Sequence, residues 1–331
     1  MEIKVFTSSS HDPFINLTYE NSLLMKIKKG ECWLLVYRND PSIVMGRFQN
    51  PWIECDFDKI KQDGVHLVRR QSGGGTVYHD INNLNYCFLH GTREHHSEKN
   101  HQIVIDALLE LGVCAFSTKR SDLKVLSNGE QKISGSAFKQ KKERSLHHGT
   151  LLINTDLAIL NRYLKSKHAG AISKGTKSNP SSVINLIEIN NQINYRSIIE
   201  ELNNSFAKSF GHSRCMIQKV EDFLELDCEY LNKLKSPEWI LYETPYFSLN
   251  QSVGDFHISF EAKKGIFLSV SIEWKRLDSF DIGLLERFLV GEKIHQKTLE
   301  SVTSEFKEYV NCSEEILSSL VKKLKLLGIF N

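Results

Sequence analysis

The residues most suited to chemistry lie in one run, Arg69 to Asp80, which reads RRQSGGGTVYHD. Two arginines precede three consecutive glycines there. Because glycine has no Cβ and readily adopts positive φ, such a run lets the backbone approach a ligand and point successive N–H groups at an anion. Guanidinium groups suit a phosphate or carboxylate. The run therefore predicts an anion-binding loop, with a flexible surface turn beside a solvated arginine pair as the alternative.

The glycine run matches neither common nucleotide-binding motif. No Gly-Lys-Ser/Thr follows it, and it lacks the G-x-G-x-x-G spacing at the start of a helix, so P-loop and Rossmann interpretations are disfavoured. Ser72, His79 and Asp80 could suggest a serine hydrolase. However, the G-x-S-x-G turn is absent, and residues this close along the chain point in divergent directions.

Lys132 is the second candidate, within the segment Gln131–Ala137 (QKISGSA). Its small neighbours leave the ammonium group accessible, and a compact positive charge can neutralise a phosphate. An edge-strand lysine that discourages aggregation is the alternative. The spacing alone does not choose between the two.

Metal and disulfide chemistry is not indicated. His95-His96 and His147-His148 are adjacent pairs, and adjacent residues on a strand face opposite sides, which disfavours shared ligation. The seven cysteines are scattered and include no C-x-x-C pair. We interpret them as reduced thiols of an intracellular protein.

Short strands and capped helices are expected to position these residues. The glycine run lies between two apolar stretches, Val65–Val68 and Tyr86–Leu89, and Asn128-Gly129 predicts a hairpin whose second strand carries Lys132. Further expected elements are helices beginning at Asp12-Pro13, Asp56, Ser97, Asp156 and Asn194, and strands over Trp33–Tyr37, Ser42–Met45, Leu123–Leu126, Gln131–Ala137 and Gly149–Asn154.

The last third of the chain has a different pattern. Apolar and polar residues alternate on both sides of Lys263-Lys264-Gly265, which predicts an antiparallel hairpin with one buried face, followed by two amphipathic helices. A length of 331 residues suits two domains, which we place at residues 1–240 and 246–331. The segment Lys165–Ser182 is rich in Lys, Ser and Gly, and is either a basic lid or a solvated linker.

Charge and hydropathy exclude some classes of function. The formal net charge of +2 implies no nucleic-acid or membrane partner, and no run approaches the roughly 18 apolar residues of a membrane span. The N-terminal residues show neither a secretion nor an import signal. We therefore expect a cytoplasmic protein.

Together, these segments resemble a lipoate–protein ligase. Arg69–Asp80 resembles the family signature RRxSGGGxVxHD, Lys132–Ala137 its lysine motif, and His147–Leu152 the strand that follows. Gly46–Trp52 and Asp12-Pro13 match family segments in order and spacing.

The chain departs from the family pattern at two positions. Asn82 stands where the family often has glycine, and asparagine is the residue next most tolerant of left-handed geometry, so the turn after Asp80 is expected to survive. Ser121 replaces an asparagine before Asp122, so the aspartate is kept and the amide is lost.

The resemblance implies an α+β catalytic domain of the class II aminoacyl-tRNA synthetase and biotin ligase type, with a small α+β C-terminal domain. It also implies a two-step reaction, in which the carboxylate of (R)-lipoate attacks the α-phosphate of ATP and a lysine of an acceptor domain then attacks lipoyl-AMP. Mg²⁺ is expected with the triphosphate. The implied acceptors are lipoyl domains of 2-oxo acid dehydrogenase E2 subunits and the glycine cleavage H protein, and a monomer is expected.

By the same resemblance, Lys132 is the catalytic residue, and Lys165–Ser182 matches the loop that covers the adenylate. The other implied site residues are Arg70, Gly75, Thr76, Val77 and Tyr78 with Lys132 for ATP and the adenylate, Arg70, Gly74, Gly75 and His79 with Lys132 for lipoate, and Ser72, Asp122, Gly135 and His148 in support.

Two other functions fit the same motifs. One is a lipoyl- or octanoyltransferase of the same fold that uses no ATP, and the other is a non-catalytic module that binds nucleotide or lipoate. The C-terminal domain favours the ligase, and the retained Lys132 argues against the binding module. A cysteine-nucleophile acyltransferase is disfavoured because no cysteine lies inside the signature motifs.

Overall fold

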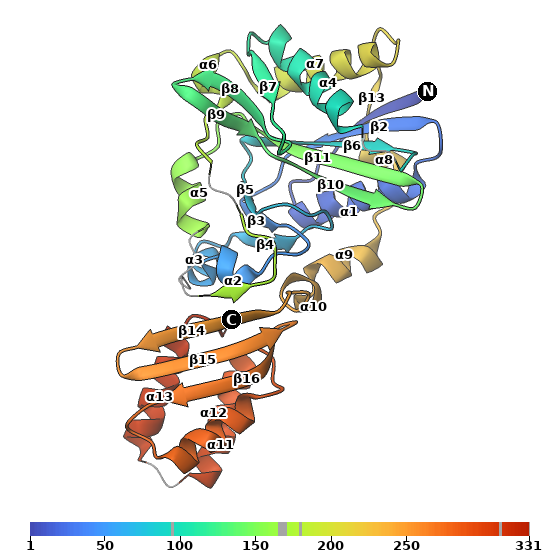
Figure 1. Cartoon of the computed structure of the whole chain (residues 1–331). Helices are drawn as coiled ribbons and strands as arrows, with labels where there is room; N and C mark the ends of the chain where they lie inside the picture. Colours follow the sequence, from blue (N-terminus) through green and yellow to red (C-terminus); the bar gives the residue numbers. More distant parts are fainter. Residues whose placement is uncertain (94–95, 165–170, 179–180, 311–312, 331) are drawn as a thin grey trace. The chain divides into compact units, whose positions relative to one another are not determined.

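The computed structural model describes residues 1–93, 96–164, 171–178, 181–310 and 313–330 (Figure 1). The chain forms two compact units, each built from separate stretches of sequence. Unit 1 comprises Met1–Arg47, Val65–Leu160 and Ser178–Ser236, and unit 2 comprises Phe48–Gly64, Asn161–Lys177 and Pro237–Asn331.

A mixed six-stranded sheet forms the centre of unit 1, in the order β10-β11-β6-β2-β1-β13. Its strands are β1 (Glu2–Thr7), β2 (Glu31–Tyr37), β6 (Asn83–His90), β10 (Ser136–Lys141), β11 (Arg144–Leu152) and β13 (Ile217–Lys219). β1 pairs in parallel with β2 and β13, and the other pairs are antiparallel. Every residue of β6 is buried, because helices cover both faces of the sheet.

Helices α4 (Ser97–Glu110) and α7 (Tyr195–Ser209) lie on one face of this sheet, and α1 (Pro13–Lys26) lies on the other (Figure 1). Apolar residues of α4 and α7 share one core with Leu34 and Phe88, whereas α1 packs against Trp33 and Leu89. The remaining helices that include residues of unit 1 are α5 (Leu157–Tyr163), α6 (Leu186–Ile189), α8 (Val220–Phe223) and α9 (Cys228–Lys235).

The helix caps test the sequence predictions directly. The expected cap at Asp12 is confirmed, since its carboxylate accepts hydrogen bonds from the N–H groups of Phe14 and Ile15. Asp156 likewise accepts bonds from the first turn of α5. The prediction for Ser97 was wrong by one residue, because His96 occupies the N-cap position and makes no side-chain capping bond.

Two three-stranded sheets in unit 1 carry the candidate loops. One has the order β4-β3-β5, formed by β3 (Ser42–Met45), β4 (His66–Arg69) and β5 (Val77–His79), and the other the order β7-β8-β9, formed by β7 (Ala115–Ser117), β8 (Leu123–Ser127) and β9 (Gly129–Ser134). The Asn-Gly hairpin is confirmed, with Ser127 opposite Gly129. The single strand expected over Gln131–Ala137 was wrong. The chain leaves one sheet after Ser134 and enters the six-stranded sheet at Ser136, so Gly135 lies at the break.

Unit 2 has its own antiparallel sheet, in the order β12-β14-β15-β16. Its strands are β12 (Ile172–Ser173), β14 (Phe247–Val253), β15 (Phe256–Lys263) and β16 (Ile266–Glu273). Its helices are α2 (Pro51–Glu54), α3 (Phe57–Gln62), α10 (Pro237–Ile240), α11 (Ser279–Leu289), α12 (Gln296–Tyr309) and α13 (Glu314–Leu326). Three helices follow the hairpin in the described part of the chain, so the prediction of two was wrong. β15 alternates strictly between buried and exposed residues, as the sequence pattern predicts.

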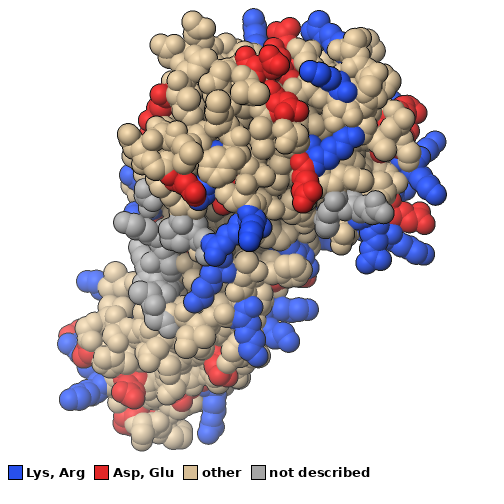
Figure 2. Space-filling model, turned by 45° about the horizontal axis from the view of Figure 1, so that its top comes forward, with Lys and Arg blue, Asp and Glu red and all other residues tan. Residues whose placement is uncertain are grey.

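Acidic and basic side chains are interspersed over the face of the molecule seen in Figure 2, in keeping with the net charge of +2. Among the described residues, no helix is long and apolar enough to cross a membrane. The predicted lid falls partly outside the described residues, because 165–170 and 179–180 are not among them.

Candidate active site

The glycine loop runs from residue 70 to 76, between β4 and β5, and Arg70 organises it from the inside. The guanidinium donates to the carbonyl oxygens of Val44 (2.9 Å), Gly73 (2.6 Å) and Gly75 (2.8 Å), and its Nε donates to Ser72 Oγ (3.0 Å). Burial lowers the pKa of Arg70 to about 10, so the group stays cationic at neutral pH. Three of its four hydrogen bonds therefore hold backbone carbonyl groups facing the buried guanidinium group.

The opposite edge of the loop carries backbone N–H groups that are available to a ligand. In the part of the chain that the structure describes, the N–H groups of Gly73, Gly74 and Gly75 have no hydrogen-bond acceptor. Consecutive free N–H groups beside a buried cation form an anion-binding concavity. The N–H of Thr76 differs, since it donates to Ser178 Oγ (3.0 Å). The loop thus has the geometry that its glycines predict.

The loop is packed too tightly for larger residues at two positions. Gly74 has a φ of +87°, and a Cβ there would lie 2.9 Å from Arg70 Nη2. A Cβ on Gly46 would lie 2.1 Å from the carbonyl oxygen of Gly74. Gly46 belongs to the segment Gly46–Trp52 that the sequence analysis identifies. Its backbone packs directly against Gly73 and Gly74 of the loop.

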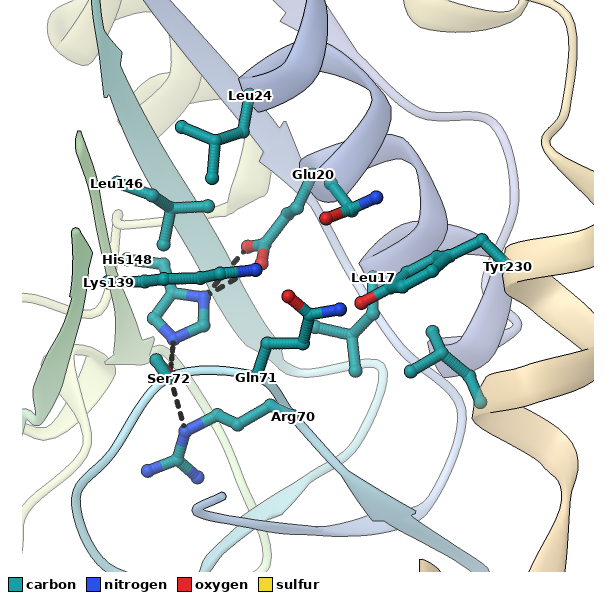
Figure 3. Close-up of a pocket in the computed structure, with 12 residues that line it drawn as sticks. Leu17, Glu20, Leu24, Arg70, Gln71, Ser72, Lys139, Leu146, His148 and Tyr230 are labelled. Carbon is teal, nitrogen blue, oxygen red and sulfur yellow. Dashed lines mark hydrogen bonds and ion pairs between the residues drawn. The ribbon is translucent and has the colours of Figure 1, made fainter. Parts of the chain in front are cut away.

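Behind the loop, four side chains form a buried relay (Figure 3). His148 Nδ1 lies 2.8 Å from a carboxylate oxygen of Glu20, and its Nε2 lies 2.7 Å from Ser72 Oγ. Because the carboxylate accepts, Nδ1 carries a proton, and a neutral ring then accepts the Ser72 hydroxyl proton at Nε2. Tyr37 also donates to Glu20 (2.9 Å), and Arg70 donates to Ser72.

Sequence reasoning missed Glu20 in this relay. The residue lies in α1, 128 positions from His148, and an acidic residue on a helix carries no signal of its own. The relay also replaces the hydrolase grouping of Ser72, His79 and Asp80, which the structure does not bring together. His79 Nδ1 instead faces the Asn39 amide nitrogen at 3.0 Å.

A small cavity of about 20 Å³ adjoins the relay (Figure 3). It has room for about one water molecule. Its apolar lining comes from leucines at positions 17, 24, 146 and 234, and its polar lining includes Ser72, His148 and Lys139. Burial lowers the pKa of Lys139 to about 8, and the charge of Lys141 acts in the same direction. No motif in the sequence points to Lys139.

Lys132 lies beside the same site, on β9. Its Nζ is 2.7 Å from Asp122 Oδ1, and a Cβ on Gly135 would lie 2.9 Å from Nζ, so the missing side chain makes room for the ammonium group. Its backbone N–H donates to Ser182 (2.9 Å), and its carbonyl accepts from Ile184 (3.1 Å). Because a second segment bridges this strand edge, protection of a free edge no longer explains the lysine.

Ala137 is where these parts converge. A Cβ on Gly74 would lie 3.5 Å from the Ala137 Cβ, and Ala137 pairs with His148 across β10 and β11. Gly135, against which Lys132 packs, lies only two residues earlier. Ala137 therefore lies between the glycine loop and the strand that carries His148, and the ammonium group of Lys132 lies beside the same segment at Gly135.

Other predicted site residues have positions of their own. Tyr78 is buried in β5, and Val77 is half-buried. His79 Nε2 has no hydrogen-bond partner within the described residues, and burial lowers the pKa of His79 to about 3, so its ring is neutral. Asp80 accepts bonds from Asn82 N–H (2.9 Å) and Thr155 Oγ1 (3.3 Å) and closes a turn.

The two departures from the family pattern differ in outcome. The expectation that the turn after Asp80 survives is confirmed, since Asn83 N–H donates to the Asp80 carbonyl and Asn82 N–H to its carboxylate, but Asn82 forms this turn without the left-handed geometry expected there. Ser121 does adopt it, with a φ of +64°. The predicted opposite orientation of the two adjacent histidines is confirmed, since His147 lies against Phe138 and His101 whereas His148 faces Glu20.

Metal binding was tested against the donors present. Within the described ranges, no group of three or more His, Cys, Asp or Glu could hold a metal ion. The carboxylate beside Lys132 is Asp122. Mg²⁺ needs only one or two protein carboxylates when phosphates and water supply its other ligands, so these residues fit an ion that arrives with a nucleotide.

Comparison with known proteins identifies relatives over most of the chain. The profile of the lipoyl protein ligase A/B catalytic domain matches residues 12–207. A lipoate-protein ligase A from Bdellovibrio bacteriovorus is 36% identical over 78% of this chain and 80% of its own length. Another, from Psychrobacter cryohalolentis, is 32% identical over 91% of both chains.

Solved structures agree with the sequence matches. LipL1 from P. falciparum, in complex with lipoate, has a TM-score of 0.63 and 27% identity, and covers 97% of this chain and 98% of its own. A lipoate-protein ligase A bound with ATP has a TM-score of 0.60 and 25% identity, and covers 72% and 98%. A bipartite lipoate protein ligase solved with its E2 lipoyl domain, from Thermoplasma acidophilum, shares the fold at a TM-score of 0.62 and 24% identity, covering 72% and 96%.

Proposed function

The chain belongs to the lipoyl protein ligase A/B family, and from that premise we propose that it is an ATP-dependent lipoate–protein ligase. One observation carries the proposal: free N–H groups of the glycine loop lie beside Ala137, and the Lys132 ammonium group lies against Gly135, two residues earlier in the same segment. A site that joins a carboxylate to a nucleotide must offset the repulsion of two anions, and these groups supply the charge and donors for that purpose.

In the first step, a carboxylate oxygen of lipoate attacks the α-phosphorus of ATP, and pyrophosphate leaves. We assign the N–H groups of Gly73 to Gly75 to the phosphates, because their carbonyls are held away by Arg70. Lys132 neutralises charge between the phosphate and the acyl oxygen. Arg70 is assigned to shaping the loop, since all its recorded bonds go to protein acceptors.

In the second step, a lysine amine of an acceptor domain attacks the carbonyl carbon of lipoyl-AMP, an amide forms and AMP leaves. Lys132 stays beside the carbonyl oxygen in this step and stabilises the charge that develops there. Lipoyl domains of 2-oxo acid dehydrogenase E2 subunits and the glycine cleavage H protein are the proposed acceptors. The monomeric state and the cytoplasmic location stay predictions.

The acyl tail is assigned to the side of the loop where the leucine-lined cavity lies. Lipoate carries an aliphatic chain and a dithiolane ring, which need an apolar lining. A cavity of about 20 Å³ is far too small for them, so binding requires the lining side chains to move. Lys139 and Tyr230 are polar lining residues whose displacement would open it.

Mg²⁺ is proposed to accompany the triphosphate, where it would neutralise the leaving pyrophosphate. Asp122 is the residue that could hold it. The Asp122 carboxylate now pairs with Lys132, so the ion and the ammonium group would share one acidic side chain.

Lipoate-dependent ATP–pyrophosphate exchange tests the proposal. Exchange by the wild-type protein is expected to require lipoate, and Lys132→Ala is expected to abolish it. Lys124→Ala is the matched control, because Lys124 lies opposite Lys132 on β8 and pairs with Glu130 away from the loop. Absence of exchange, with transfer from synthetic lipoyl-AMP intact, would instead identify an ATP-independent transferase.

A further inference from the structure

Ser121 has an unusual backbone conformation next to the catalytic lysine. Among the described residues other than glycine, only Ser121 and Lys264 have positive φ, and Lys264 lies in a hairpin turn. Ser121 also lies in a turn, the one that joins β7 to β8, but its left-handed conformation is unfavourable for an L-residue other than asparagine or aspartate. It immediately precedes Asp122, whose carboxylate contacts Lys132 Nζ at 2.7 Å.

The backbone around Ser121 is fixed by two sets of bonds. On the inner side, Thr118 closes the loop, since its carbonyl accepts from Ser121 N–H (3.0 Å) and its hydroxyl accepts from Asp122 N–H (3.2 Å). On the other side, the carbonyl oxygen of Ser121 accepts a bond from Ser136 Oγ at 2.7 Å. This is the bond that ties the unfavourable conformation to the six-stranded sheet.

Ser136 is itself oriented by a buried histidine. His101 Nε2 lies 3.3 Å from Ser136 Oγ. Because the single hydroxyl proton of Ser136 goes to Ser121, Ser136 must accept from His101, which places a proton on Nε2. His101 is buried in α4. Two successive hydrogen bonds therefore lead from α4 through the Ser136 hydroxyl to the carbonyl oxygen of Ser121.

We propose that Ser136, oriented by His101, is a positioning residue for Lys132. Its hydroxyl holds Ser121 in the left-handed conformation that aims Asp122 at Lys132 Nζ. Its backbone also sets the place of Gly135, because Ser136 pairs with Gly149 in β11. The ammonium group is therefore placed between Asp122 and Gly135 by one residue that acts on both. This inference rests on the proposed function, in which Lys132 is catalytic.

Ser136→Ala tests the inference. We expect kcat for lipoate-dependent ATP–pyrophosphate exchange to fall by about ten- to hundredfold, as displacements on the order of 1 Å cost in other active sites, while KM for ATP changes less. Ser136→Thr keeps the hydroxyl and is expected to restore most of the rate. Ser145→Ala is the matched control, because Ser145 is a buried serine at the far end of the same hairpin, opposite Gln140.

Double mutants separate positioning from a general loss of stability. Glycine adopts positive φ freely, so Ser136→Ala should cost less in a Ser121→Gly background than in the wild type. It should also cost little once Asp122→Asn has removed the carboxylate. Full loss from Ser136→Ala in both backgrounds would overturn the inference, and so would unchanged exchange by Ser136→Ala alone. If Ser136→Ala fails to fold, His101→Gln replaces it in the same cycles, and equal losses with and without the Asp122 carboxylate again contradict positioning.

The wild-type protein distinguishes this inference from the proposed function. If the wild type shows no lipoate-dependent exchange, the proposed function fails. If the wild type exchanges and Ser136→Ala matches it, only the positioning inference fails.

Discussion

Replacing Gly74 with alanine is expected to disable the glycine loop, whereas the same change at Gly73 is expected to be tolerated. The three glycines look equivalent in the sequence, but the structure makes them different. Gly74 has a φ of +87°, and its new Cβ would lie 2.9 Å from Arg70 Nη2. A Cβ on Gly73 meets no atom within 4 Å, and a Cβ on Gly75 would lie 3.3 Å from Ser178 Oγ.

The size of the effect follows from these contacts. An L-residue in left-handed geometry costs about 1–2 kcal/mol. The Arg70 Nη2 that must move donates to the carbonyls of Gly73 (2.6 Å) and Gly75 (2.8 Å), and losing one such charged bond costs about 1.5–3 kcal/mol. Gly74→Ala should therefore lower the free energy of unfolding by about 2.5–5 kcal/mol, a large part of the roughly 5–15 kcal/mol typical of a folded protein.

Urea denaturation and lipoate-dependent ATP–pyrophosphate exchange measure the two consequences. Gly74→Ala should lower the urea midpoint and remove most of the exchange activity, because the N–H groups of the loop lose their arrangement. Gly73→Ala should leave the unfolding midpoint nearly unchanged, and Gly75→Ala should fall between the two. Equal stability and equal exchange for Gly73→Ala and Gly74→Ala would refute this account of the loop.

Three further predictions follow from other contacts. Arg70→Lys should reduce exchange and lower the urea midpoint, because a single ammonium group cannot reach Val44, Ser72 and the loop carbonyls together; wild-type values would contradict it. Burial lowers the pKa of His79 to about 3 and of His90 to about 4, whereas an unfolded histidine titrates near about 6.5. The unfolded chain therefore takes up these protons first, so stability should be level above about pH 6.5 and fall as the pH is lowered towards about 4, and a flat urea midpoint over that range would refute the assignment. Ser121→Gly should raise the melting temperature, since relief of left-handed strain is worth about 1 kcal/mol, and an unchanged melting temperature would show that Ser121 is not strained.

Local features of the fold could be predicted from the sequence because neighbouring residues determine them. The Asp12 cap depends on the two N–H groups that follow it, and the Asn128-Gly129 turn depends on positive φ at Gly129, which is +96° in the structure. The strict alternation in β15 has the same origin, since a strand with one buried face repeats every two residues. The motif order also sufficed to predict the family, which the comparisons confirm.

Predictions failed where the local structure depended on contacts with residues far away in the sequence. Nothing local in Gln131–Ala137 shows that the chain changes sheets at Gly135, because the two halves pair with strands from different parts of the sequence. The division into domains at residues 1–240 and 246–331 stays a prediction, and the structure adds that the two compact units are each assembled from three separate stretches.

The glycine loop shows where sequence information ends. Residue types alone predicted that it could bind an anion, because glycines free the backbone and arginines supply positive charge, but they left a flexible surface turn as the alternative. Only the tertiary structure decided that Arg70 faces inward, that Ser72 meets His148 and that His148 meets Glu20. Those contacts join residues 76 and 128 positions apart, and packing of the whole unit brings them within hydrogen-bond distance.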